Sequence, residues 1–211
     1  MLHLCGSTPV ILAGGMGTRL RRVVADRPKP LALVAGKPFI TYLLEQLLLA
    51  GFKKAVIASG YLGGQFREHF GECYQTLKLH YSQEPMPLGT GGALRYALPH
   101  VTHSLLLVLN GDSFCDINFQ SILEFHLQKQ ARITLAAVKV PDVGRYGSIE
   151  MSPHGEITHF VEKGAHVGAG YINAGVYLLE RSVIEVLGPN AAFSLEREVL
   201  CTHNNGTMFS F

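Results

Sequence analysis

Three glycines within four positions, followed closely by an arginine, form the segment of this chain best suited to bind phosphate. Gly14, Gly15 and Gly17 come directly after the apolar run Val10–Ala13, a pattern typical of a short buried strand. Glycine allows amide N–H groups to approach a ligand closely, and a group of such amides favours an anion. Arg19 adds a permanently charged, planar guanidinium. We therefore expect a loop that holds a nucleoside triphosphate, formed by Leu12, Ala13, Gly14, Gly15, Gly17 and Thr18.

A lysine enclosed by two prolines lies ten residues after this arginine. In Pro28-Lys29-Pro30 the two rings restrict the backbone on both sides of the lysine. Its ammonium is a compact point charge, so Lys29 is expected to bind the same triphosphate as Arg19. An ordinary strand-to-helix turn would explain the glycines, but it would explain neither of these two cations.

Two other glycine-rich motifs fit the segment badly. The phosphate loop of ATPases ends in Gly-Lys-Ser or Gly-Lys-Thr, whereas this chain has Gly17-Thr18-Arg19. The dinucleotide-binding motif needs a third glycine where Leu20 stands, and an acidic residue at the end of the second strand, where Ala55–Gly60 has none. A nicotinamide dehydrogenase is therefore disfavoured.

A carboxylate follows the most apolar strand pattern of the chain. Asp112, in Asn110-Gly111-Asp112, comes immediately after the apolar run Leu105–Leu109. Ligands of open α/β sheets bind at the carboxyl ends of the strands, and one or two carboxylates together with substrate phosphates are the usual ligands of Mg²⁺. We expect Asp112 to bind Mg²⁺ beside the nucleotide; the alternative is an aspartate that only begins a turn.

A second glycine-rich segment, Leu88–Ala93, opens a predicted helix. Its functional interpretation is a slot in which a flat base lies against bare backbone, with hydrogen bonds from amides and from the Gln83 side chain. An ordinary connection between a strand and a helix would have the same composition. The nucleotide-binding residues expected here are Gln83, Gly89, Thr90 and Gly92.

Several polar residues of the last third of the chain share a region in which a sugar-sized ligand could meet the nucleotide. Each motif is weak alone, because a Glu-Lys pair is more often a solvated strand end and a Tyr-Gly pair more often a turn. Lys163 would hold a phosphate, while Glu162 and Asn173 would bind hydroxyl groups. The sugar-phosphate site is thus expected to contain Tyr146, Gly147, Glu162, Lys163 and Asn173.

The alternation of strand-like and helix-like segments predicts an α/β fold of one domain: a Rossmann-like, mainly parallel sheet with helices on both faces. A small antiparallel excursion over the ligand edge is expected after Val140. The expected strands are Val10–Ala13, Ala55–Ser59, Leu77–Tyr81, Leu105–Leu109, Ile133–Val140, Gly147–Met151, Ile157–Val161 and Ile172–Leu179. The expected helices are Phe39–Leu49, Gln65–Phe70, Ala93–Leu98, one capped by Asn118, and two near Arg181–Leu187 and Ser194–Leu200.

The composition limits the class of partner. Among 211 residues, 18 Lys and Arg stand against 16 Asp and Glu, and the basic residues are scattered along the chain, so we expect neither nucleic acid nor a membrane surface as a partner. Four cysteines without a Cys-x-x-Cys pair argue against zinc and disulfides and favour a reducing cytoplasm. No apolar run approaches the roughly 20 residues that span a bilayer.

Taken in order, the motifs resemble those of the sugar-1-phosphate nucleotidyltransferases, over almost the whole chain. The resemblance is greatest to the D-glycero-α-D-manno-heptose 1-phosphate guanylyltransferases, partly through Arg145-Tyr146-Gly147 and Phe193-Ser194-Leu195-Glu196. It implies the nucleotide-diphospho-sugar transferase fold and the transfer of a nucleotidyl group, with GTP favoured, to a heptose- or mannose-type sugar 1-phosphate. The motifs that carry it are Gly14–Leu20, Pro28–Pro30, Leu88–Ala93, Asn110–Asp112, Tyr146-Gly147, Glu162-Lys163 and Asn173–Gly175.

The resemblance also implies roles. The catalytic residues would be Arg19, which stabilises the departing pyrophosphate, and Lys29, which neutralises the phosphates near the reacting phosphorus. Asp112 would hold Mg²⁺, and Lys163 would orient the attacking phosphate. A homo-oligomer and a cytoplasmic place in the synthesis of bacterial surface polysaccharide or lipopolysaccharide are further expectations from the family.

One departure from the family affects the metal site. The family usually carries a second metal-binding aspartate near its C-terminus, and no match to it follows Asp142. We expect that the chain lacks its C-terminal end; the alternative is half a metal site. Two other functions stay open: transfer of a uridylyl or other nucleotidyl group to a different sugar phosphate, and a non-catalytic protein that binds a nucleotide sugar.

Overall fold

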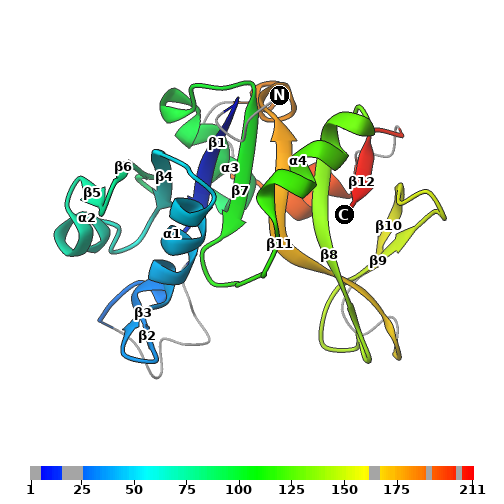
Figure 1. Cartoon of the computed structure of the whole chain (residues 1–211), viewed down its shortest axis with the longest axis horizontal. Coiled ribbons are helices and arrows are strands. Elements are labelled where there is room, and N and C mark those ends of the chain that lie inside the picture. Colours follow the sequence, from blue (N-terminus) through cyan, green and yellow to red (C-terminus); the bar gives the residue numbers. More distant parts are fainter. Residues whose placement is uncertain (1–5, 16–25, 162–166, 189–191, 203–205) are drawn as a thin grey trace.

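The structure is a computed structural model that describes residues 6–15, 26–161, 167–188, 192–202 and 206–211. Among these residues, a ten-stranded mixed sheet runs through the molecule (Figure 1). Its parallel part has the order β7-β1-β4-β6. The first strand, β1, therefore lies between β4 and β7, which both come later in the chain. The bounds of these strands are β1 Ser7–Leu12, β4 Lys54–Ser59, β6 Leu77–Gln83 and β7 Leu105–Asn110.

Helices cover both faces of the sheet, as the sequence predicts. Figure 1 shows α1 and α4 in front of the strands and α3 behind them. Successive residues of β1 point to opposite faces, so Ile11 packs in the core under α1 while Val10 packs in the core under α3. The helices are α1 Phe39–Leu49, α2 Gly64–Phe70, α3 Gly89–Ala97, α4 Phe119–Gln128 and α5 Arg181–Glu185. Shorter helical turns are η2 Lys29–Leu31, η3 Leu98–His100 and η4 Leu195–Leu200, the last with π-type hydrogen bonds.

The antiparallel part of the sheet is organised around one long strand, β11 (Gly170–Glu180). It pairs antiparallel with β7 and with β8 (Ile133–Val140). Its register with β8 shifts between Asn173 and Tyr177, where Gly175 has a φ of 77°. Such a bulge re-aims the side chains around it. The other antiparallel strands are β9 Ser148–Met151 and β10 Ile157–Val161.

Most predicted elements are confirmed to within a few residues, and the Asn118 side chain caps α4 by accepting a hydrogen bond from Ser121 N at 3.0 Å. The prediction was wrong for α3, which begins at Gly89 rather than Ala93, so the second glycine segment forms its first turn. Four short strands lack a pattern that predicts them: β2 Leu33–Val34, β3 Lys37–Pro38, β5 Cys73–Tyr74 and β12 Met208–Ser210. No helix among the described residues is long and apolar enough to cross a bilayer.

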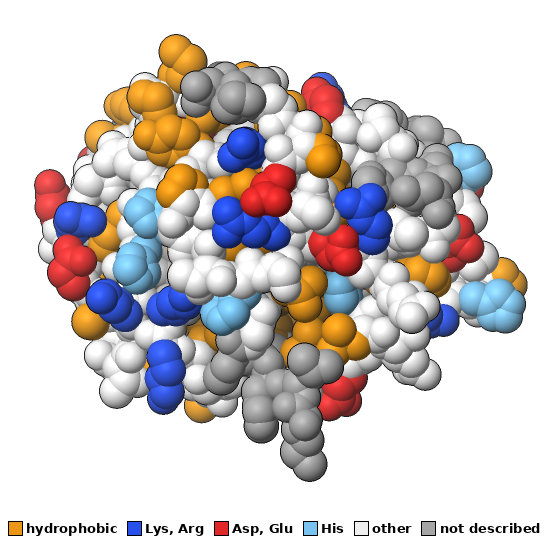
Figure 2. Space-filling view, turned by 90° about the horizontal axis from the view of Figure 1, so that it is seen from above, with side chains coloured by type: hydrophobic (Ala, Val, Ile, Leu, Met, Phe, Trp, Pro, Cys, Tyr) orange, Lys and Arg blue, Asp and Glu red, His pale blue; other side chains and the backbone are white. Residues whose placement is uncertain are grey.

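The end of the sheet at which β1, β4 and β7 begin carries charges of both signs. Figure 2 looks onto this end and shows lysine, arginine and acidic side chains interspersed over the visible face, with histidines among them. The rings of His80 and His100 lie 6.0 Å apart there. Burial, followed by the charges of Lys78, His100 and Lys54, lowers the pKa of His80. Both histidines are partly buried, and neither belongs to the carboxyl edge described below.

Candidate active site

Two sequence-predicted site residues 83 positions apart meet at the carboxyl edge of the sheet. Lys29 Nζ donates a hydrogen bond to Asp112 Oδ2 at 2.5 Å. The two side chains are 38% and 43% exposed, so the pair faces solvent and can be reached by a substrate. A surface pair of this kind adds little stability, so the fold does not depend on this contact.

The backbone around this pair explains how the contact forms. Lys29 begins the turn η2, and Pro30 of this turn is buried. Gly111 N donates to Leu12 O at 2.8 Å, and a Cβ on Gly111 would lie only 2.6 Å from the same oxygen. Glycine is therefore required where β7 ends beside β1. This close approach places Asp112 next to the end of β1, from which Gly14 and Gly15 continue.

A buried carboxyl group lies where the neighbouring strands end. Glu84 follows β6 and is only 8% exposed. A Cβ on Gly14 or on Gly60 would lie 3.0 Å or 2.5 Å from Glu84 Oε1, so both glycines make room for this side chain. Glu84 Oε2 accepts a hydrogen bond from Leu88 N at 3.2 Å. Burial raises the pKa of Glu84, and the hydrogen bond from Leu88 opposes that rise.

Gln83, which we expected at the base slot, is exposed, while its neighbour Glu84 is buried. Adjacent residues at the end of a strand point to opposite sides, so the two side chains cannot serve the same site. The sequence shows a carboxylate, Glu84, directly after Gln83, but our prediction of the base slot named only Gln83. The role of Gln83 stays a prediction that the structure does not favour.

The second glycine segment packs against a part of the chain about one hundred residues later. Gly91 N and Gly92 N donate to Phe193 O at 3.1 Å and 3.3 Å. A Cβ on Gly91 would lie 2.1 Å from the Phe193 ring, and one on Gly89 would lie 2.5 Å from Phe193 O. The glycines therefore have a packing role that the expected base slot did not include. The nucleotide contacts of Gly89, Thr90 and Gly92 stay predictions.

Predicted sugar-site and nucleotide-site residues are joined through two side chains that sequence reasoning missed. Asn173 Nδ2 donates to the Tyr177 hydroxyl at 2.7 Å, and this hydroxyl donates to Glu196 Oε1 at 3.4 Å. Thr90 donates to the other carboxylate oxygen, Glu196 Oε2, at 2.7 Å. No sequence pattern pairs Tyr177 with Glu196, although Glu196 belongs to one of the segments that carry the family resemblance.

The remaining predicted residues lie apart from these contacts or outside the described part of the chain. Tyr146 is 49% exposed, and its N–H donates to Val143 O at 2.7 Å in a turn before β9. Gly147 is exposed in the same turn. The residues outside the described ranges are Gly17, Thr18, Arg19, Glu162 and Lys163.

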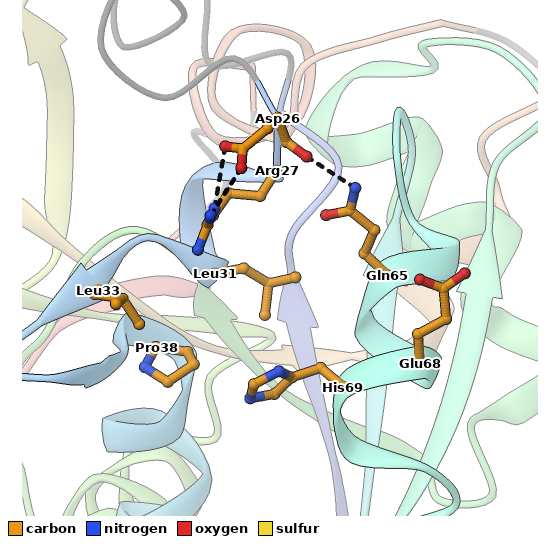
Figure 3. A pocket seen from close by; sticks show the side chains of 8 residues that line it. All are labelled: Asp26, Arg27, Leu31, Leu33, Pro38, Gln65, Glu68 and His69. Carbon is orange, nitrogen blue, oxygen red and sulfur yellow. Dashed lines mark hydrogen bonds and ion pairs between the residues drawn. The ribbon is translucent and has the colours of Figure 1, made fainter.

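A cavity of about 400 Å³ opens beside η2, between the β2–β3 hairpin and α2. Figure 3 shows Arg27 paired with Asp26 above it, and Gln65 reaching from α2 to the Asp26 backbone oxygen at 2.9 Å. None of the predicted site residues lines this cavity, whose lining consists of Asp26, Arg27, Leu31, Leu33, Pro38, Gln65, Glu68 and His69. It borders the turn that carries Lys29 but does not contain the Lys29–Asp112 pair.

The described residues form an α/β fold with a charged pair at the carboxyl edge of its sheet, and the comparison with family models gives the class of the protein. Residues 8–201 match the model of the nucleotidyl transferases. The chain therefore belongs to the nucleotidyl transferase family, as its motifs predict.

Two curated relatives give the similarity in more detail. The chain is 34% identical, over 90% of its length, to a D-glycero-α-D-manno-heptose 1-phosphate guanylyltransferase of Aneurinibacillus thermoaerophilus and covers 82% of that protein. It is also 34% identical, over 90% of its length, to a mannose-1-phosphate guanylyltransferase of Mycobacterium tuberculosis, of which it covers 53%. The chain thus spans most of the first relative and about half of the second.

Solved structures agree with these relatives. The crystal structure of HddC from Yersinia pseudotuberculosis has a TM-score of 0.87 at 34% identity, covering 97% of this chain and 89% of HddC. The structure of HddC complexed with GMP-PN has a TM-score of 0.85 at 33% identity. The α/β fold with a mainly parallel sheet is thereby confirmed.

Proposed function

We propose that this protein transfers a guanylyl group from GTP to a heptose- or mannose-type sugar 1-phosphate and releases pyrophosphate. The observation that carries the proposal is the Lys29–Asp112 pair, because a cation and a carboxylate lie together at the carboxyl edge, where open α/β sheets bind their ligands. The guanylyltransferase names of the similar proteins support GTP and this class of sugar.

The reaction needs positioning and charge neutralisation rather than a covalent intermediate. A phosphate oxygen of the sugar 1-phosphate forms a bond to the α-phosphorus. The bond between this phosphorus and the bridging β-oxygen breaks, and its electron pair leaves with pyrophosphate. In our proposal Lys29 neutralises charge at the α-phosphate and Arg19 neutralises the pyrophosphate, while Lys163 orients the attacking phosphate. Glu162 and Asn173 bind sugar hydroxyls beside the Tyr146–Gly147 turn.

The donor set fits a magnesium ion that is held mainly by the substrate. Asp112 provides exposed carboxylate oxygens at the carboxyl edge, and the described residues contain no group of three or more His, Cys, Asp or Glu side chains that could enclose a metal. Mg²⁺ commonly uses one or two carboxylates together with phosphates and water. When bound, the ion would stabilise negative charge on the phosphates. We propose Asp112 as the ligand of this ion. Lys29 would compete with the ion for Asp112 Oδ2, which it contacts in the structure.

We further propose that Glu84 selects guanine. The Watson–Crick edge of guanine offers two donors side by side, the N1–H and the N2–H, and an ionised carboxylate accepts both. Glu84 lies buried against the backbone at Gly14 and Gly60, at the ends of β1 and β4, where a base could stack on bare backbone. A charge-assisted pair of hydrogen bonds at a buried site gives strong discrimination, because other bases leave the carboxylate without its donors.

Glu84→Gln should reduce the preference for GTP over UTP by roughly 10-fold to 100-fold, because an amide offers one acceptor and one donor instead of two acceptors. The ratio of kcat/KM for the two triphosphates measures this. Gln83→Ala is the matched control, since Gln83 is the exposed neighbour. If Gln83→Ala loses the preference for GTP and Glu84→Gln keeps it, then Gln83 and not Glu84 contacts the base.

The same assignment predicts a pH dependence. Burial raises the pKa of Glu84, so protonation of this carboxyl begins at a higher pH than for an exposed glutamate. The protonated form has lost one of the two acceptors for guanine. GTP affinity should therefore rise as the pH increases through the raised pKa, and Glu84→Gln should lose this dependence. Titration calorimetry with GTP from acidic to neutral pH measures both.

The activity itself is tested by pyrophosphate release from GTP, UTP, CTP and ATP, with Mg²⁺ and a panel of heptose, mannose and glucose 1-phosphates. Release with GTP and a heptose or mannose 1-phosphate is the expected result. Release with UTP and another sugar would show a different nucleotidyl transfer, and nucleotide binding without any release would show a binding protein. We place the enzyme in the cytoplasm, in the synthesis of surface polysaccharide precursors, because the similar proteins are named as sugar 1-phosphate guanylyltransferases and the four cysteines form no Cys-x-x-Cys pair.

A further inference from the structure

A buried tyrosine lies at the centre of a chain of hydrogen bonds that links the two proposed substrate sites. Tyr177 is 0% exposed and lies on β11, four residues after Asn173. Its hydroxyl contacts the Asn173 and Asn110 side chains and the Glu196 carboxylate of η4. The second carboxylate oxygen of Glu196 accepts hydrogen bonds from Thr90 and from Ser194, at 2.7 Å and 2.8 Å. β11, η4 and α3 are thereby connected through polar atoms.

The carboxylate determines the direction of every hydrogen bond in this chain. An ionised carboxylate only accepts, so the Tyr177 hydroxyl must donate its hydrogen to Glu196. The oxygen of this hydroxyl is then left to accept from Asn173 Nδ2. At the other side of the same amide, Asn173 Oδ1 accepts from Gly175 N at 2.9 Å. These two contacts hold the Asn173 amide in one orientation.

This orientation matters because an amide offers different groups at its two ends. One N–H of Nδ2 and one lone pair of Oδ1 are left over after the two internal contacts, and they can donate to one sugar hydroxyl and accept from another. Asn173 pairs with Ala137 of β8, and two residues later a Cβ on Gly175 would lie 2.9 Å from Asn110 Nδ2 of β7. The side chains of Asn173 and Asn110 both hydrogen-bond Tyr177. Asn110 ends the strand that precedes Asp112, so Asn173 lies on the side of the sheet edge that carries the proposed metal ligand.

The other arm of the carboxylate reaches the nucleotide side. Thr90, in the first turn of α3, donates to Glu196 and accepts from Leu195 N at 2.8 Å. Glu196 therefore holds the first turn of α3 against η4 through one hydroxyl group. A packing role alone would need neither contact, because phenylalanine would fill the space of Tyr177 and an apolar residue could replace Glu196.

We propose that Glu196 is a positioning residue for both substrates. It orients Asn173 for the sugar through Tyr177, and it holds the glycine-rich turn of α3 for the nucleotide through Thr90. This proposal rests on the proposed function and goes beyond it, because neither Tyr177 nor Glu196 touches the reacting atoms. The two arms can be separated experimentally, because Thr90 contacts Glu196 directly and not through Tyr177.

Tyr177→Phe and Glu196→Gln test the two arms by steady-state kinetics with varied GTP and varied mannose 1-phosphate. Tyr177→Phe should raise the KM for the sugar phosphate about tenfold and leave the KM for GTP unchanged. Glu196→Gln should raise both KM values, because its amide can no longer accept from Tyr177 and from Thr90 in the same arrangement. The double variant should raise the sugar KM no more than Glu196→Gln does, since both changes break one chain.

Matched controls are Tyr96→Phe on α3 and Glu185→Gln on α5, which make the same chemical changes at exposed positions. Both should leave the two KM values unchanged. Thermal unfolding is measured for every variant. If Tyr177→Phe and Glu196→Gln lower the melting temperature but leave both KM values unchanged, the network is only structural and the proposal is wrong.

A readout without turnover separates this proposal from the proposed function. The side-chain amide hydrogens of Asn173 can be followed by NMR in the protein without substrate, and both variants should speed their exchange with solvent. A wild-type protein inactive on every sugar phosphate would contradict the proposed function, while faster amide exchange in the variants would still support the positioning of Asn173. Unchanged exchange in both variants would overturn it.

Discussion

Lys29→Ala is expected to lower kcat/KM for guanylyl transfer by roughly 100-fold to 1,000-fold, the loss typical of removing one preorganised charge from a transition state. The fold should survive, because Lys29 is 38% exposed and its ion pair with Asp112 lies at the surface. Such pairs contribute at most about 1 kcal/mol to the free energy of unfolding. Pyrophosphate release measures the loss, and thermal unfolding followed by circular dichroism measures stability.

The chain offers a closely matched control for this variant. Lys37 Nζ lies 2.6 Å from Glu45 Oε2, and the two side chains are 37% and 38% exposed. Lys37→Ala therefore removes an equivalent ion pair away from Asp112 and should leave turnover unchanged. If Lys29→Ala and Lys37→Ala have equal activity, the proposal that Lys29 neutralises the phosphates is wrong.

Asp112→Asn should abolish turnover at ordinary Mg²⁺ concentrations, because the neutral amide keeps the shape of the side chain but loses the charge that Mg²⁺ needs. Raising the Mg²⁺ concentration should restore a part of the activity if the substrate phosphates supply the other ligands. Lys29 loses its charged partner in this variant, but it stays exposed, so the change in the free energy of unfolding should remain below about 1 kcal/mol.

A titration of activity with Mg²⁺ checks this prediction, with Asp116→Asn as the control. Asp116 is exposed in the same loop, four residues after Asp112. It should retain the metal dependence of the wild-type enzyme. Wild-type metal dependence in Asp112→Asn would show that the metal binds elsewhere.

Local patterns predicted most elements because their causes are local. The helix α1 has its apolar residues at helical spacing, with a proline before it and a glycine soon after it. The side chain of Asn118 accepts a hydrogen bond from an N–H group in the first turn of α4. Such a cap can be predicted from the type of one residue. The extension of α3 back to Gly89 was not foreseen, because glycine in a helix interior normally costs stability, and here the contact with Phe193 compensates for it.

The parts of the site that resisted prediction depend on contacts between distant residues. The sequence places Lys29 and Asp112 on separate segments, and only the order β7-β1 brings those segments together. The choice between Gln83 and Glu84 depends on the residue at which β6 ends, which is the least reliable part of a strand prediction. The contact of Tyr177 with Glu196 requires the position of η4 on the sheet, which no periodicity reports.

The packing of Phe193 on α3 joins two segments that are synthesised about one hundred residues apart. The strands β1, β4, β6 and β7 all lie within the first 110 residues and can pair as soon as these residues leave the ribosome. The N–H groups of Gly91 and Gly92, in the first turn of α3, reach their acceptor, the Phe193 carbonyl oxygen, only after Phe193 has been synthesised. At roughly 5–20 residues per second the delay is on the order of 5–20 s. During this time the N–H groups of Gly91 and Gly92 lack the acceptor that they have in the finished protein.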